Sequence, residues 1–151
     1  MSLKQRKKEF IMVELPDKPS DLIRLAVKDL QSCIEKNYVV DMFDWYSEND
    51  GICTVCIAGA VMAESLGLSP ADDLSIGPNR RFSELGRDRC NKLLALNHFH
   101  FGYMRQGCSE LNIELPSNCP KIVEIAKYSA NPSEFFKCML DMADKFESFG
   151  L

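Results

Sequence analysis

The most constraining feature of this sequence is the run of residues 52–67, ICTVCIAGAVMAESLG, in which only Thr54, Glu64 and Ser65 are polar. Its length, and a closing Gly67 that suits a helix C-terminus, predict one helix over the whole run. A helix that is apolar on nearly all sides lies buried in the middle of a domain. We therefore expect the rest of the chain to pack around residues 52–67.

Amphipathic helices are predicted towards both ends of the chain. Residues 21–36 repeat apolar side chains at helical spacing behind Ser20, which suits the N-cap position. Residues 131–150 open with Asn131, Pro132 and Glu134, a capping-box-like start. The apolar face of this last helix either belongs to the core, which we favour for most of its side chains, or forms a contact between two copies. It consists of Phe135, Phe136, Met139, Met142, Phe146 and Phe149.

Two more helices are expected, one from Ser83 to about Asn97 and one after Pro120. The stretch HFHFGYMRQG either continues the first of these or breaks it at Gly102. Between the first two helices, β-branched and aromatic residues near 38–47, followed by Asp50-Gly51, indicate a short strand or hairpin, or an aromatic loop over the core. The predicted fold is mainly α, a compact bundle of about five helices with a short β element near 38–47.

The length of 151 residues suits one domain. Charges and two prolines in residues 1–19 predict a poorly ordered lead-in, so residues 20–151 would form a single helical domain. The net charge of −4 does not favour nucleic acid as a partner, although the basic residues 80–92 are the best candidate for one. No apolar run approaches the roughly 20 residues that span a bilayer, so no membrane contact is expected.

Seven irregularly spaced cysteines and an N-terminus without a secretory signal indicate a reducing, cytoplasmic setting with free thiols. Catalytic residues are not assigned, because the sequence contains no nucleophile elbow, no Walker A motif and no G-x-G-x-x-G. The sequence therefore favours a protein that is not an enzyme.

Cys53 and Cys56 are the candidate metal ligands. On a helix, their spacing puts both thiols on one face, about 4.5 Å apart along the axis, and zinc could use such a pair. A thiol-redox pair is a second interpretation, in which a helix N-terminus lowers the pKa of Cys53. Small residues packed in the core explain the motif better, so no cofactor is expected and zinc is the alternative. Further zinc ligands would have to come from Cys90, His98, His100, Cys108 and Cys119.

Residues 38–67 join YVVDMFDW to CTVCIAGAVMAESLG. This combination resembles a group of short uncharacterised proteins of bacterial phages and prophages, which pair a Trp-containing segment with a C-x-V-C-x-A-G-A-V-M-A helix. The resemblance implies a phage accessory protein in the cytoplasm and carries over no site residues. We therefore expect a non-enzymatic accessory protein that acts through a protein partner or as a homodimer. The alternative is a metal-binding or thiol-redox protein that uses Cys53 and Cys56.

Overall fold

The computed structural model describes residues 13–68, 85–119 and 125–151. Within these ranges the chain is mainly helical with a short β element, as the sequence predicts; it has five helices and one small three-stranded sheet. The elements are α2 (Pro19–Glu35), β1 (Val39–Val40), β2 (Tyr46–Asn49), β3 (Ile52–Val55), α3 (Ile57–Ala63), α5 (Arg87–Phe99), α6 (Met104–Glu110) and α7 (Pro132–Ser148). None of the helices in these ranges has the length and apolar character that crossing a bilayer requires.

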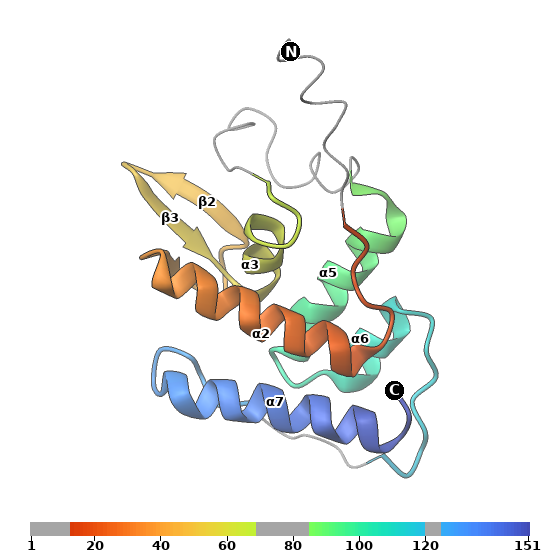
Figure 1. The fold of residues 1–151 in the computed structure, drawn as a ribbon. Helices are drawn as coiled ribbons and strands as arrows, with labels where there is room; N and C mark the ends of the chain where they lie inside the picture. Colours follow the sequence, from red (N-terminus) through yellow and green to blue (C-terminus); the bar gives the residue numbers. More distant parts are fainter. Residues whose placement is uncertain (1–12, 69–84, 120–124) are drawn as a thin grey trace.

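The two long helices α2 and α7 lie side by side and run antiparallel (Figure 1). Ser20, near the start of α2, donates its hydroxyl proton to the carbonyl of Leu151, 2.7 Å away beyond the end of α7. Ser20 is therefore not the N-cap that the sequence predicts. Lys18 holds that position, because Pro19 is suited to the first turn of the helix by its fixed φ.

The start of α7 is the predicted one: the side chain of Asn131 accepts a hydrogen bond from the Glu134 amide at 3.2 Å. Most of the apolar face of α7 is core, as the sequence favours. Phe146 packs against Phe99 of α5, with ring centroids 5.2 Å apart. The fully or nearly fully buried side chains of this face are Phe135, Met139, Met142 and Phe146.

The predicted helix over residues 52–67 is wrong at both ends, because α3 covers only Ile57–Ala63 and its C-cap is Glu64 rather than Gly67. Residues 52–55 form β3, which pairs antiparallel with β2 and parallel with β1 in the order β1-β3-β2. The reason is the turn at Asp50 and Gly51, whose φ angles of 53° and 79° match the two-residue turn that closes a twisted hairpin. The pairing of Tyr46 with Val55 then gives these backbone groups partners across the sheet rather than along a helix.

The helix that remains, α3, packs directly on the hairpin through Gly59. A Cβ atom at Gly59 would lie 1.4 Å from the carbonyl oxygen of Trp45. That carbonyl also accepts a hydrogen bond from the Cys56 amide at 3.2 Å. Gly59 is a small core residue of this segment, and its close neighbour is the backbone beside β2 and not a helix.

Of the two alternatives for the stretch HFHFGYMRQG, the break near Gly102 is the one that the structure has. α5 ends at Phe99, Gly102 has a φ of 87°, and α6 begins at Met104. The predicted start at Ser83 lies outside the described residues, and so do residues 120–124 of the predicted helix after Pro120. The described part of that segment, residues 125–127, is not helical.

Candidate functional site

Cys53 and Cys56 do not share a helix face. Cys53 lies half-buried on β3 opposite Glu48, whereas Cys56 is the buried N-cap of α3 and its sulfur accepts a hydrogen bond from the Gly59 amide at 3.4 Å. The helical spacing on which the proposed zinc pair depends is therefore absent. The thiol at the helix start is that of Cys56, not Cys53.

Burial keeps several thiols of this chain protonated at neutral pH. It raises the pKa of Cys56 to about 11, although the amides at the start of α3 oppose this shift. Burial also raises the pKa of Cys33 to about 12 and that of Cys108 to about 11, and in Cys108 the nearby Cys119 adds to the shift. Because the thiolate is the reactive form, these three thiols are poor nucleophiles.

The remaining candidate ligands do not assemble into a metal centre in the described ranges, which contain no group of three or more suitable His, Cys, Asp or Glu side chains. His98 points to Glu110, with 3.4 Å between its Nε2 and the carboxylate. His100 is buried, and Cys90 lies half-buried on α5.

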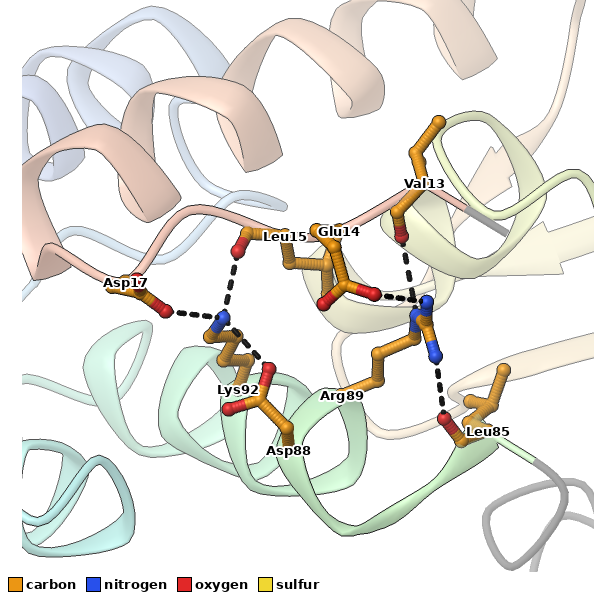
Figure 2. Close-up of polar contacts among 8 residues, drawn as sticks. All are labelled: Val13, Glu14, Leu15, Asp17, Leu85, Asp88, Arg89 and Lys92. Carbon is orange, nitrogen blue, oxygen red and sulfur yellow. Dashed lines mark hydrogen bonds and ion pairs between the residues drawn. The ribbon is translucent and has the colours of Figure 1, made fainter. Parts of the chain in front are cut away.

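The basic segment at residues 80–92 uses two of its cations inside the molecule (Figure 2). Lys92 is only 3% exposed, and its ammonium donates to the Leu15 carbonyl at 2.7 Å and to the carboxylates of Asp17 and Asp88, each at 2.8 Å. Burial alone would lower the pKa of Lys92, but these hydrogen bonds outweigh it and raise that pKa. With its three donors occupied, Lys92 is not free to bind phosphate.

Arg89 is held in the same way. It donates to the carbonyls of Val13 and Leu85 and pairs with Glu14 at 2.6 Å. We refer to residues 13–17 as the N-terminal strap, which runs alongside α5 (Figures 1 and 2). The sequence assigns these residues to a poorly ordered lead-in, whereas in the structure Leu15 of the strap belongs to the hydrophobic core.

A pocket of about 260 Å³ lies between the strap, α5 and α6. The charged groups that line it are Asp17, Asp88, Lys92 and Glu110. Lys92 pairs with both aspartates, and Glu110 pairs with His98. The cation in this lining, Lys92, is therefore already bonded to both aspartates, and the pocket is a weaker candidate than the surface described next.

Three aromatic rings form a continuous exposed surface, which we name the aromatic surface: Phe43, Phe101 and Tyr103. Phe43 is 87% exposed, Tyr103 52% and Phe101 40%. The ring centroids of Phe43 and Phe101 are 6.3 Å apart, and those of Phe101 and Tyr103 are 6.1 Å apart. Large apolar side chains that gather in this way on a surface indicate an interaction site, whereas single exposed ones do not.

Local hydrogen bonds fix the loop that carries Phe43. The carboxylate of Asp41 accepts a hydrogen bond from the Phe43 amide at 3.0 Å, and the carbonyl of Asp41 accepts one from the Asp44 amide at 3.1 Å. The amide of Asp41 in turn donates to the Val55 carbonyl on β3 at 2.9 Å. This turn holds Phe43 outward from a loop that is tied to the sheet.

The other two rings follow the end of α5. The carbonyl of His98 accepts the amides of Phe101 and Tyr103, and the positive φ of Gly102 reverses the chain between them. As a result Phe101 and Tyr103 face solvent, while Phe99 points into the core.

His100 lies beneath this surface, 5% exposed, with its ring centroid 4.0 Å from that of Phe101. Neither ring nitrogen has a hydrogen-bond partner among the described residues. Burial lowers the pKa of His100 from its ordinary 6.5 to about 4, so the ring is neutral at physiological pH.

The shifted pKa of His100 predicts an acid-sensitive contribution to stability. Between pH 6.5 and about 4 the unfolded chain binds a proton at His100 that the folded chain does not, so the free energy of unfolding falls as the pH drops through this window. We expect a loss on the order of 2 kcal/mol. Asp29 acts in the opposite direction, because burial raises its pKa from 3.8 to about 6 and stabilises the folded state as the pH falls.

The test is urea unfolding of the wild type and of His100→Leu above and below this window. Asp29 is present in both proteins, so their difference isolates His100. The stability of the wild type relative to His100→Leu should fall on acidification. An unchanged difference would show that His100 titrates normally or not at all.

The sequence does not single out the aromatic surface. It places the exposed apolar candidates on the last helix and treats residues 38–47 as a strand or a loop over the core. The signal that it does contain is Phe43 in the midst of turn-forming and charged residues, DMFDW, followed by a second aromatic pair around a glycine, FGY.

Comparisons with protein-family models, with curated proteins and with solved structures each found no match to this chain.

Proposed function

We propose that this protein is a non-enzymatic interaction protein that self-associates through the aromatic surface. The observation that carries the proposal is the 87% exposure of Phe43, whose ring is nonetheless held in place against Phe101 by a hydrogen-bonded loop. A ring that is already ordered loses little conformational entropy when a partner covers it. Covering a phenylalanine contributes roughly 2 kcal/mol to association.

The charge around the surface favours a protein partner over nucleic acid. Residues 38–53 contain four carboxylates, from Asp41, Asp44, Glu48 and Asp50, and no lysine or arginine. Surfaces that stack bases on aromatic rings also need positive charge for the phosphate backbone. The acidic loop that carries Phe43 repels that backbone and attracts a segment that combines cations with apolar side chains, while the exposed Arg105 follows Tyr103 by two residues.

The phage-type accessory role is part of the same proposal and depends on the resemblance alone. The stretch that carries the resemblance, residues 38–67, includes Phe43. A self-associating accessory protein is compatible with the mainly helical fold and its small sheet.

The test is sedimentation velocity of the full chain over a wide concentration range, with Phe43→Ser as the variant. Since Phe43 is almost fully exposed, the substitution should leave the free energy of unfolding nearly unchanged. Each lost contact should weaken association roughly 30-fold, which corresponds to about 2 kcal/mol, and a dimer with two such contacts loses both. Ile52→Ser is the matched control, because Ile52 is also apolar and 53% exposed, on the strand β3 to which the Phe43 loop is tied.

The proposal is overturned if the wild type remains monomeric throughout the concentration range. It is equally overturned if Phe43→Ser and Ile52→Ser weaken association to the same extent, because the contact would then not be centred on the aromatic surface.

A further inference from the structure

We infer that the occupant of the aromatic surface is the basic N-terminal segment of a second copy, residues 4–12. This inference rests on the proposed self-association and names the segment that carries it. It follows from the charge of the surface, the composition of the segment and the direction in which the strap runs.

The surface is not suited to meeting its own copy face to face. Phe43 is followed directly by Asp44 and preceded, two residues earlier, by the exposed Asp41, and both carboxylates belong to the loop that fixes the ring. A two-fold contact of this loop with itself would bring like charges together, which is destabilising. The occupant should instead supply cations next to apolar side chains.

Residues 4–12 have that composition. The sequence KQRKKEFIM carries the cations Lys4, Arg6, Lys7 and Lys8 against one carboxylate, and Phe10, Ile11 and Met12 follow directly. In the aromatic surface, Asp41 and Asp44 flank Phe43, whose ring contacts that of Phe101. Phe10 is the natural partner for the rings, and Lys7 and Lys8 for the carboxylates.

The direction of the strap favours docking on a second copy. Val13 contacts Arg89 near the start of α5, whereas Asp17 contacts Lys92 one turn further on. Followed backwards from Asp17 to Val13, the chain therefore runs towards the N-terminal end of α5 (Figure 2). The aromatic surface lies beyond the opposite end of α5, and the rise from Arg89 to Phe99 alone is about 15 Å. Docking on its own surface would require the segment to double back along α5.

The experiment is complementation between two full-length variants, followed by sedimentation velocity. One variant, Phe43→Ser, has a disabled surface and an intact segment. The other, Lys7→Glu with Lys8→Glu and Phe10→Ser, has a disabled segment and an intact surface. Each alone should associate at least tenfold more weakly than the wild type, and a mixture of the two should form a heterodimer through one intact contact. Added salt should weaken the wild-type dimer, because the contact includes ion pairs.

Two controls accompany the mixture. Lys18→Glu makes one such charge reversal just outside the segment, and it should leave association unchanged. Arg80→Glu with Arg81→Glu and Phe82→Ser tests the other basic and aromatic stretch of the chain, NRRF, as a competing occupant.

The outcomes separate this inference from the proposed function. If Phe43→Ser dissociates the dimer and the segment variant does not, self-association through the aromatic surface stands and the segment is the wrong occupant. Absence of a heterodimer in the mixture also overturns the inference, and so does dissociation by the residue 80–82 variant in place of the segment variant. If neither variant changes association, both proposals fail.

Discussion

Gly59→Ala should lower the free energy of unfolding by about 3 kcal/mol or more, the size of a severe overpacking effect. In an ordinary helix the same change would stabilise by roughly 1 kcal/mol, since alanine is the better helix former. Here the new methyl group would lie 1.4 Å from the Trp45 carbonyl oxygen and 2.5 Å from its carbon. Both atoms belong to the backbone, and the carbonyl oxygen also accepts a hydrogen bond from the Cys56 amide. Since the backbone cannot move aside as a side chain would, α3 and the hairpin must separate.

Urea unfolding followed by the fluorescence of Trp45, the single tryptophan of the chain, measures this effect next to the contact itself. Gly51→Ala is the control, because Gly51 has open space around it and only its φ of +79° disfavours a side chain. We expect that control to cost about 1 kcal/mol. A Gly59→Ala protein as stable as the wild type would mean that α3 does not pack on Trp45 as described.

Lys92→Met should lower the free energy of unfolding by about 1–2 kcal/mol, because the Leu15 carbonyl loses its donor, whereas the side chains of Asp17 and Asp88 are 94% and 65% exposed and are hydrated by water instead. Methionine retains an apolar stem but leaves the Leu15 carbonyl without its donor. It also releases Asp17, whose pKa is lowered by the hydrogen bond and the charge of Lys92. The strap should therefore detach from α5.

Hydrogen exchange of the strap amides, together with urea unfolding, checks both parts of this prediction. The amides of residues 13–17 should exchange faster in Lys92→Met than in the wild type. Lys36→Met is the matched control, since Lys36 forms an ion pair with Glu64 at 2.8 Å but is largely exposed. Equal effects of the two substitutions would refute the view that the burial of Lys92 is what secures the strap.

The helices α2 and α7 are predictable from sequence because their apolar residues repeat every three or four positions over 17 residues each. The strand β3 is not, since ICTV is a short apolar run that periodicity alone cannot distinguish from the first turn of a helix. Its partner β2 and the Asp50-Gly51 turn decide the matter. Whether these residues form a strand therefore depends on pairing with another segment, and the sequence of one segment alone does not show that pairing.

The aromatic surface cannot be predicted from the sequence for a related reason. Phe43 and Phe101 are far apart in the chain, and a phenylalanine is most often buried, so neither residue indicates its own exposure. Their contact exists only because β3 ties the Asp41 loop to the sheet and Gly102 ends α5 beside it. For Lys92 the sequence errs in the opposite direction. A lysine in a basic segment is expected to be exposed to solvent or to bind phosphate, whereas contact with the strap buries Lys92.

The most direct test of the central claim places a photoreactive benzophenone amino acid at position 43 in isotopically heavy chains. These chains are mixed with unlabelled wild type and irradiated, and the cross-linked peptides are identified by mass spectrometry. Self-association through the aromatic surface predicts cross-links that join a heavy peptide containing position 43 to a light peptide, and the inferred occupant predicts that the light peptide contains residues 4–12. Cross-links confined to heavy chains, or none at all, would contradict the claim that this surface faces a second copy.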